Sequence, residues 1–551
     1  MYTSLSLCGA LALAVAARCA PATGASTNPV VDLGVTVHQG SLNATGGYYN
    51  FSNIPYAEPP VGALSGSPTQ DYRQQDPSGA WLGISVPFML SEISAGTAGS
   101  NSTGSLAPAS TPDPRENEDC LLLDVIAPKT AFDNKATKKV PVLVWIHGGG
   151  YTAGSKNDNN PAGLVAQGMR DGKAGFVYVG INYRLGLFGF PPSNGASDKY
   201  SVVTNAGLYD QRLALRWIQK NIHLFGGDAD AVTVMGESAG AGSVTFQMMT
   251  TMSDGSSSYN SKRTPFNKAI IQSPATRPAA DAALYAQVYR QFLATANVTS
   301  MEQARSLSSV QLAQINGQMV ANSAFASFTF GPNVDGQFIT EIPSVGLAAG
   351  HIDRSVDTIV AHNLQEGLLF TDPRVQNQTA FKAFMTNLMP TVADAKIEYL
   401  VNNIYPEPGT AAAAGLPYTT QTQRLSLAIA EGAITCNAFG VDLAMLNKTR
   451  SYQFSVYPGI HAQDVGYTFF NKDGSDSASG FGLSRTIAKA MQNIFADFAM
   501  VGATGAGSAA SQVPVFTNAA NMLNITNSGM QVVTDPAANA TCRYWLTGLF
   551  S

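Results

Sequence analysis

Short apolar runs alternate with amphipathic segments over most of the chain. Val140–Ile146 and Phe176–Ile181 are nearly all apolar and rich in β-branched residues, which is typical of strands buried on both faces of a parallel sheet. Leu208–Asn221 places Leu213 and Trp217 four residues apart among charged residues, which predicts an amphipathic helix. Further strands are predicted at Asn117–Val125, Ala269–Ile271, Thr358–Ala361 and Tyr452–Tyr457. This alternation predicts an α/β fold, with a mostly parallel central sheet covered by helices on both faces.

The last long apolar pattern falls at Leu483–Met500. Its large apolar residues recur at helical spacing, which predicts a helix packed against the core rather than a lipid-binding face. Between Gly62 and Arg115 the chain is instead rich in Ser, Gly, Thr, Ala and Pro, with one apolar island at Trp81–Ile93. We therefore expect a long surface loop there.

The chain begins with an apolar run, Leu5–Ala17, that is followed by small residues. Its length suits a secretory signal and is too short to span a bilayer, so residues 1–20 are predicted to be a signal peptide. Because no Lys or Arg precedes the run, a buried N-terminal helix is the alternative. No break follows, and residues 21–551 are expected to form a single domain of an extracellular protein without stable membrane insertion.

The amino-acid composition limits the kinds of molecule that this protein is expected to bind. Hydrophobic residues make up 45% of the chain and charged residues 13%, and the net charge is −5. A protein that binds nucleic acid carries dense Lys and Arg clusters, which are lacking here. We expect a monomer acting on a small molecule. Eight N-x-[ST] sequons support passage through a secretory route, at Asn43, Asn50, Asn101, Asn297, Asn377, Asn447, Asn524 and Asn539.

Three cysteines remain beyond the predicted signal: Cys120, Cys436 and Cys542. In an oxidising compartment, one disulfide and one unpaired thiol is the simplest outcome. The chain has no CxxC pair and no histidine cluster, so neither a metal site nor a cofactor is predicted.

The strongest chemical signal is Gly236-Glu237-Ser238-Ala239-Gly240, directly after the apolar run Val232–Met235. A strand, a sharp turn and a helix in this order expose a serine hydroxyl above the sheet edge, while the small flanking residues allow neighbouring segments to approach. In a chain with 52 glycines the pattern alone arises easily by chance. Its meaning depends on finding a base, an acid and oxyanion donors.

Of six histidines, His461 is the best candidate for the base, because it lies in a loop after a predicted strand. Glu366 follows the predicted strand Thr358–Ala361 and is the candidate acid, with Asp335 and Asp464 as alternatives. Ser238, Glu366 and His461 then follow the order nucleophile, acid, base that hydrolases of this architecture use.

Donors for an oxyanion are predicted in His147-Gly148-Gly149-Gly150-Tyr151, immediately after a strand. The N–H groups of Gly149 and Gly150 can converge there with that of Ala239. A plain glycine turn is the alternative.

These motifs, with Glu118-Asp119-Cys120-Leu121, Asn182-Tyr183-Arg184 and Phe225-Gly226-Gly227-Asp228, resemble the type-B carboxylesterase/lipase family, the cholinesterase-like α/β hydrolases, and most of all its secreted fungal members. The resemblance covers most of the chain. It implies the α/β-hydrolase fold with large loop and helical insertions. It also implies ester hydrolysis through an acyl-enzyme, with Ser238 as nucleophile, Glu366 as acid, His461 as base, and Gly149, Gly150 and Ala239 as the oxyanion hole.

The resemblance also implies a substrate pocket and a disulfide. Phe328 and Phe330 match the segment that lines the acyl pocket in cholinesterases, Tyr151 is assigned to substrate binding with them, and Ala326 stands where those enzymes carry another phenylalanine. The alternative is that the two phenylalanines are core residues. Similar fungal sequences carry a cysteine just ahead of a terminal aromatic residue, which implies a disulfide between Cys436 and Cys542. The usual upstream partner of Cys120 is missing.

The leading hypothesis is a secreted carboxylesterase acting on small to medium esters. A lipase and a non-catalytic binding protein of the same family are the alternatives. A lipase lid must be amphipathic, whereas Ser94–Thr111 is almost all Gly, Ala, Ser, Thr and Asn, which favours the esterase; the island Trp81–Ile93 is the other candidate lid.

Overall fold

The structure is a computed structural model, and it describes residues 28–60, 117–194, 202–250, 264–279, 281–471 and 483–549. The predicted signal peptide, the loop between Gly62 and Arg115 with its sequon at Asn101, and the island Trp81–Ile93 lie outside these ranges. Those interpretations stay predictions.

The described residues contain an eleven-stranded sheet in the order β13-β12-β11-β10-β9-β8-β6-β7-β5-β4-β3 and a separate two-stranded pair, β1-β2. The strands are β1 Val30–Asp32, β2 Val37–Gln39, β3 Ser41–Asn43, β4 Tyr48–Pro55, β5 Leu122–Pro128, β6 Val140–Ile146, β7 Val177–Ile181, β8 Gly227–Glu237, β9 Lys268–Gln272, β10 Asp357–Asn363, β11 Thr449–Ser455, β12 Asn521–Thr526 and β13 Gly529–Thr534. The strands from β7 through β12 pair in parallel, and both ends of the sheet are antiparallel. The predicted fold class is confirmed.

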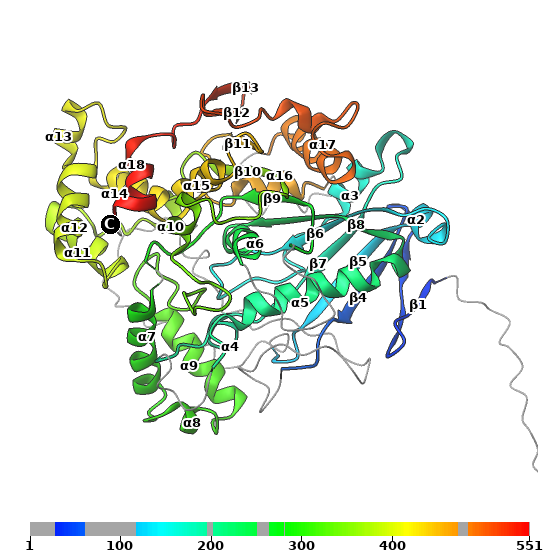
Figure 1. Cartoon of the computed structure of the whole chain (residues 1–551), viewed down its shortest axis with the longest axis horizontal. Helices are drawn as coiled ribbons and strands as arrows, with labels where there is room; N and C mark the ends of the chain where they lie inside the picture. The colour runs from blue at the N-terminus through cyan, green and yellow to red at the C-terminus, as the bar shows by residue number, and fades with distance from the viewer. Residues whose placement is uncertain are drawn as a thin grey trace, which may run out of the picture.

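The described helices are α2 Lys129–Asp133, α3 Ala162–Gly168, α4 Gly186–Gly189, α5 Ala206–Asn221, α6 Ala239–Met249, α7 Ala282–Thr295, α8 Met301–Ala304, α9 Ser309–Ala321, α10 Pro343–Ala348, α11 Gln378–Leu388, α12 Asp394–Tyr399, α13 Pro408–Ala413, α14 Gln421–Ala430, α15 Cys436–Ala444, α16 Gln463–Thr468, α17 Arg485–Val501 and α18 Ala540–Arg543. Figure 1 shows α5 on one side of the sheet and α3 with α17 on the other. Helices therefore cover both faces, as predicted.

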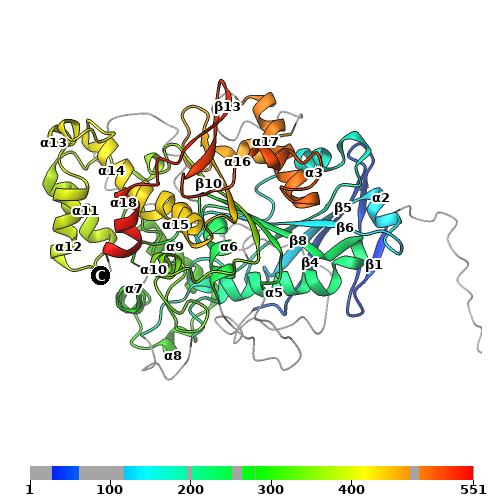
Figure 2. The same cartoon turned by 45° about the horizontal axis from the view of Figure 1, so that its top comes forward.

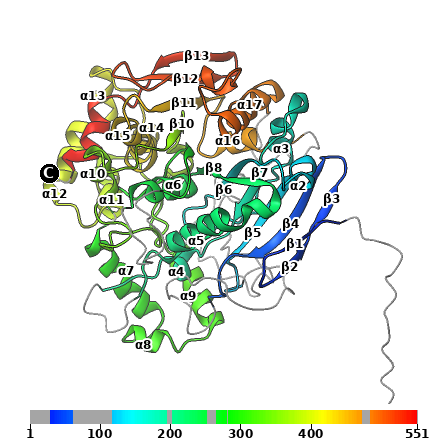
Figure 3. The same cartoon turned by 45° about the vertical axis from the view of Figure 1, so that its right-hand side comes forward.

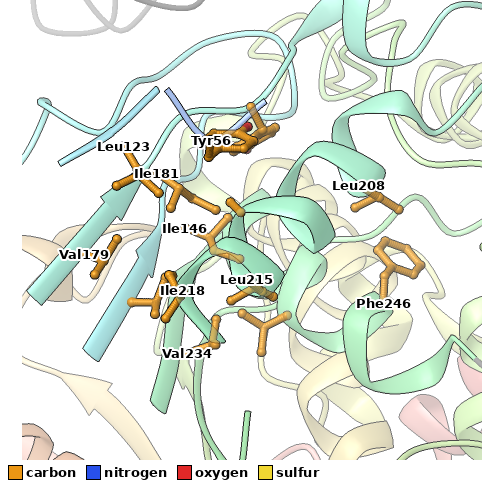
Figure 4. Close-up of a cluster of buried hydrophobic side chains, with 14 of the residues drawn as sticks. Tyr56, Leu123, Ile146, Val179, Ile181, Leu208, Leu215, Ile218, Val234 and Phe246 are labelled. Carbon is orange, nitrogen blue, oxygen red and sulfur yellow. The ribbon is translucent and has the colours of Figure 1, made fainter. Parts of the chain in front are cut away.

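The α5 face holds the larger hydrophobic core. Leu215 and Ile218 of α5 are fully buried with Val179 and Ile181 of β7, and Phe246 of α6 joins the same cluster (Figure 4). Burying each large aliphatic side chain contributes roughly 1.5 to 3 kcal/mol, so this layer holds α5 and α6 firmly against the central strands. The predicted helix at Leu208–Asn221 is α5, which begins two residues earlier.

The opposite face is covered by α3, α16 and α17 (Figure 2). Ile487, Met491, Ile494 and Phe498 form the apolar stripe of α17 and are all buried in this second core. The predicted helix at Leu483–Met500 is therefore a core helix.

A third cluster is helical and lies beyond the strands, at the end of the molecule opposite β1–β4 (Figures 1 and 2). It packs α11, α14 and α15 against the C-terminal segment around Trp545. One helical stretch in it, Gln421–Ala444, is long and apolar enough to cross a bilayer, but 78% of its most apolar window is buried inside the protein. Burial of that kind is ordinary for a core helix.

The N-terminal edge departs most from the sequence prediction. β1–β4 were not predicted, because the first three are short and mostly exposed and carry no sustained apolar run. The strand predicted at Asn117–Val125 is β5, which begins at Leu122 and continues to Pro128. Pairing with β4 and β7 rather than local sequence sets these limits.

Cys436, at the start of α15, is bonded to Cys542 of α18 across a sequence separation of 106 residues. This is the pairing that the resemblance implied. Cys120 is a free, buried thiol. Its neighbours include the Arg184–Asp210 pair, and burial is the largest of the effects that raise the pKa of its thiol.

Replacing both bridged cysteines (Cys436→Ser with Cys542→Ser) should lower the free energy of unfolding by about 2 to 4 kcal/mol, because the bridge restricts the unfolded chain. Urea unfolding followed by tryptophan fluorescence measures the change. Dithiothreitol should destabilise the natural chain and leave the double variant unaffected. Equal unfolding midpoints for the two proteins without reductant would contradict a stabilising role.

Candidate functional site

Ser238 occupies the sharp turn between β8 and α6. Its backbone has φ 57 and ψ −124, a strained conformation for a residue with a side chain. A Cβ on Gly240 would lie 2.1 Å from the carbonyl oxygen of Ile146, and one on Gly236 would lie 2.5 Å from the carbonyl carbon of Gly240. The two glycines are thus required by close backbone approach, as the motif predicts.

Ser238, His461 and Glu366 come together at the carboxyl edge of the sheet. His461 Nε2 lies 2.9 Å from Ser238 Oγ, and His461 Nδ1 lies 2.6 Å from Glu366 Oε2. The serine follows β8, the glutamate lies three residues after β10, and the histidine lies in the loop after β11. Because these strands run parallel in one sheet, their carboxyl ends meet at one edge.

Glu366 is fully buried, and its other oxygen, Oε1, accepts the N–H of Asn363 at 2.5 Å. Burial by itself would raise the pKa of Glu366, but the charge of His461 and the hydrogen bonds from His461 and Asn363 outweigh it. The resulting pKa lies below the ordinary value of a glutamate. Glu366 is therefore an ionised partner that fixes the orientation of the imidazole.

The two alternative acids have other hydrogen-bond partners. Asp464 accepts hydrogen bonds from Gln272 Nε2 at 2.8 Å and Asn363 Nδ2 at 3.3 Å. Asp335 accepts the N–H groups of Gln337 and Ile339 in its own loop. Neither makes a hydrogen bond to His461 within the described part of the chain.

The other histidines have separate partners or positions. His362 lies within β10, 3.4 Å from Asp535, and His147 lies 2.9 Å from the carbonyl oxygen of Gly148. His38 contacts Thr36, His351 contacts Glu341, and His223 lies in the turn after α5. Within the described ranges, only His461 reaches a serine hydroxyl and a carboxylate together.

Glu237 is a site residue that the sequence analysis did not single out. Its Oε1 lies 3.4 Å from His461 Nε2, and the side chain is buried. Burial, with smaller effects of Asp464 and Glu366, raises the pKa of Glu237 to about 8. The available signal was an acidic residue next to the serine in an otherwise apolar run.

The carboxyl groups around His461 also act on the imidazole. Burial opposes its protonation, but Glu237, Glu366 and Asp464 together outweigh burial and raise the pKa of His461 above its ordinary value. A proton on Glu237 removes one of these charges, so the ionised Glu366 is the lasting cause.

Gly149 and Gly150 lie three and four residues beyond β6, with φ of 103 and 62. The Gly149 carbonyl accepts the N–H groups of Thr152 and Ala153, which pins the turn, while no acceptor among the described residues bonds the N–H of Gly149 or Gly150. Ala239 is the first residue of α6, where N–H groups have no acceptor within the helix. Free backbone donors thus occur on both sides of Ser238.

Of the three residues assigned to substrate binding, Phe328 lies at the site. It is half-buried, and a Cβ on Gly150 would lie 2.3 Å from its ring. Its ring centroid lies 6.0 Å from that of Phe370, which lies 5.1 Å from the His461 ring. Phe370 was missed by the sequence analysis, because only the fold brings it to His461.

The other two residues assigned to substrate binding are more deeply buried. Phe330 is 1% exposed and Tyr151 is 6% exposed, and both pack in the main core. Their assignment to substrate binding stays a prediction. Arg277 holds the neighbouring loop by donating to the carbonyl oxygens of Ser327 and Thr329, in a stretch where Ala326, Phe328 and Thr329 all have positive φ.

The described residues contain no cluster of three or more His, Cys, Asp or Glu side chains that could hold a metal ion.

Comparison with known proteins supplies the family. The family model of the carboxylesterase family matches residues 33–545. The chain is 36% identical to the carboxylesterase patB of Aspergillus clavatus, over 94% of this chain and 95% of that protein. It is 32% identical to the secreted triacylglycerol lipase LIP1 of Gibberella zeae, over 73% of this chain and 69% of the lipase.

Among solved structures, Aspergillus niger EstA has the same fold, with a TM-score of 0.73, 21% sequence identity, and coverage of 94% of this chain and 98% of EstA. The family match spans the eleven-stranded sheet, the turn that carries Ser238 and the loop that carries His461. The chain belongs to the carboxylesterase family of ester hydrolases.

Proposed function

We propose that this chain is a secreted serine carboxylesterase that hydrolyses small to medium esters. The observation that carries the proposal is the continuous chain of hydrogen bonds from Ser238 Oγ through His461 to Glu366. A serine hydroxyl is a poor nucleophile unless a base removes its proton and an acid orients that base.

In the proposed reaction, Ser238 Oγ attacks the ester carbonyl carbon while His461 Nε2 takes its proton. The resulting oxyanion is bound by N–H groups of Gly149, Gly150 and Ala239. The tetrahedral intermediate then expels the alcohol, which receives the proton from His461, and an acyl-serine remains. A water molecule activated by His461 hydrolyses the acyl group in the same manner and restores Ser238.

Phe328 and Phe370 support an apolar substrate. The two rings extend one after the other in space from the Gly150 turn to His461. One side of a bound ester would rest against them. Ala326 in place of a second phenylalanine favours a pocket larger than an acetyl group requires.

Secretion is supported by the apolar N-terminal run, the Cys436–Cys542 disulfide and the sequons. Of the sequon asparagines in the described ranges, Asn43, Asn297, Asn377 and Asn447 are exposed, while Asn50, Asn524 and Asn539 are half-buried. A relative whose name includes "secreted" is consistent with this proposal.

Ser238→Ala should lower kcat/KM for short-chain p-nitrophenyl esters by at least about a thousandfold, because no other group can form the acyl-enzyme. The variant should also resist labelling by a fluorophosphonate, which should modify the natural chain once. Ser306→Ala, at an exposed serine, is the matched control and should keep full activity. More than about a tenth of the activity in the Ser238 variant would overturn the assignment and favour a non-catalytic role.

The pH profile should show activity falling with acid, since a protonated His461 cannot accept the serine proton. The pKa of His461 is raised, so the midpoint of this loss should lie above the 6.5 of a free histidine. Glu366→Gln removes the ionised carboxylate that is bonded to the imidazole and should move the midpoint of the remaining activity down. Glu341→Gln, beside the distant His351, should not move it. A flat profile between about pH 5 and 8 would argue against His461 as the base.

The esterase and lipase alternatives differ at an oil–water interface. With Ser94–Thr111 poor in apolar residues, the rate against tributyrin should saturate smoothly as its concentration crosses the solubility limit. A sharp rise at that limit would show interfacial activation and favour the lipase. A soluble p-nitrophenyl ester measured in parallel controls for enzyme loss at the interface.

A further inference from the structure

A cavity of about 540 Å³ lies at the N-terminal edge of the sheet, and Ser238, His461 and Glu366 take no part in its lining. It is formed by β3, β4, β5 and β7 with the loop 156–161 before α3. Figure 3 shows β3, β4 and β5 together at one margin of the molecule. Its volume falls in the range of about 300 to 1,000 Å³ that small-molecule sites occupy.

The strand register builds the floor of this cavity. Ser41 pairs with Asn50, Asn50 with Ile126, and Ile126 with Tyr178, so one side chain from each of four strands lies in a row on the same face. Two residues along, Asp124 pairs with Gly180, which has no side chain and leaves room beside Lys156.

Polar groups interrupt the apolar face at its edge. Farther into the sheet the same face carries Leu143, Trp145 and Met235, and the rings of Tyr48 and Tyr178 with Ile126 continue this cluster. Among them the edge adds hydroxyl, amide and carboxyl groups, together with the asparagines of the loop 156–161. A polar floor is what a site for a polar ligand requires, and it serves no purpose in an apolar core.

Two polar atoms of the floor are buried without a partner. Tyr178 is 2% exposed, and neither its hydroxyl nor the side-chain oxygen of Asn50 has a hydrogen-bond partner in the described structure. Buried polar groups in proteins are nearly always satisfied, so a donor and acceptor from outside the chain are expected between these two strands.

The charges of the cavity are already paired. Lys156 and Asp124 are the two charged residues that line it, and Lys156 Nζ lies 2.8 Å from Asp124 Oδ1. The ammonium also donates to Asn53 Oδ1 at 2.9 Å. With these charges neutralising each other, the cavity favours a neutral ligand over an anion or cation.

We propose that this cavity binds a neutral saccharide. Five asparagines, two tyrosines and a serine line the cavity with donors and acceptors, and the Ile126 side chain with the Tyr48 ring offers apolar surface for the C–H face of a sugar. Two sources supply this chemistry: a free sugar, or the first residues of an N-glycan carried by the chain itself. The second arises because the sequon asparagines Asn43 and Asn50 both line the cavity.

The experiment begins with a protein that lacks both sequons through Thr45→Ala and Ser52→Ala, since these exposed changes keep the asparagines. Isothermal titration calorimetry with N,N′-diacetylchitobiose and with maltose should detect binding of at least one of the two saccharides, with a Kd of about 10 mM or lower. Tyr178→Phe should weaken binding about fivefold to tenfold, as the loss of one hydrogen bond does.

Ser41→Trp, in the floor row, should abolish binding by filling the cavity, and Tyr457→Phe, at a tyrosine that is 77% exposed, is the matched control that should leave it unchanged. Esterase activity equal to that of the parent shows that each variant is folded. The proposal is overturned if neither saccharide binds, or if the Tyr178 and Ser41 variants bind as the parent does.

The glycosylated chain separates the two sources. If its own glycan occupies the cavity, the free saccharides will bind only after the sequons are removed, and glycosylation will raise the Tm less in the Ser41→Trp variant than in the natural chain. If a free sugar is the ligand, both forms will bind it equally.

Discussion

The approach of the first turn of α6 to the end of β6 is the contact on which the rest of the site depends. Gly240 packs so closely on the carbonyl of Ile146 that no side chain fits between them. A Cβ on Gly148 would lie 3.0 Å from Ser238 Cβ, so the turn that carries Gly149 and Gly150 also packs against this contact. The proposed nucleophile and the proposed oxyanion donors are thus held by the packing of one helix on one strand.

Several buried carboxyl groups surround one imidazole, and burying all of them as charged carboxylates would be unfavourable. Protonation of some of these groups lowers that cost. Glu366 keeps its charge because His461 and Asn363 donate to it. Burial raises the pKa of Glu237 to about 8 and, with Glu366, raises that of Asp464 to about 6. Near neutral pH the cluster therefore carries fewer charges than carboxyl groups, and the amides of Gln272 and Asn363 satisfy Asp464.

The parts of this protein that the sequence predicts are those with a strong local signal. Uninterrupted apolar runs predict β6 and β7, and an apolar stripe at helical spacing predicts α17. The glycines that its turn requires identify Ser238. His461 and Glu366 follow from chain order and from the rule that parallel strands end at one edge. Phe370 and Glu237 become site residues only through contacts across the fold. The polar row from Ser41 to Tyr178 is likewise invisible in the sequence, because it joins four strands that are far apart in the chain.

The burial of Cys120 makes its thiol a reporter of local opening of the structure. Once the predicted signal is removed and Cys436 is bridged to Cys542, Cys120 is the remaining thiol of the chain, and it is only 3% exposed. Burial disfavours the thiolate on which alkylating reagents act. A folded molecule therefore does not react with such a reagent, whereas a molecule in which this region has opened is alkylated irreversibly. The fraction of alkylated chains in a population thus measures how often the region around β5 has opened.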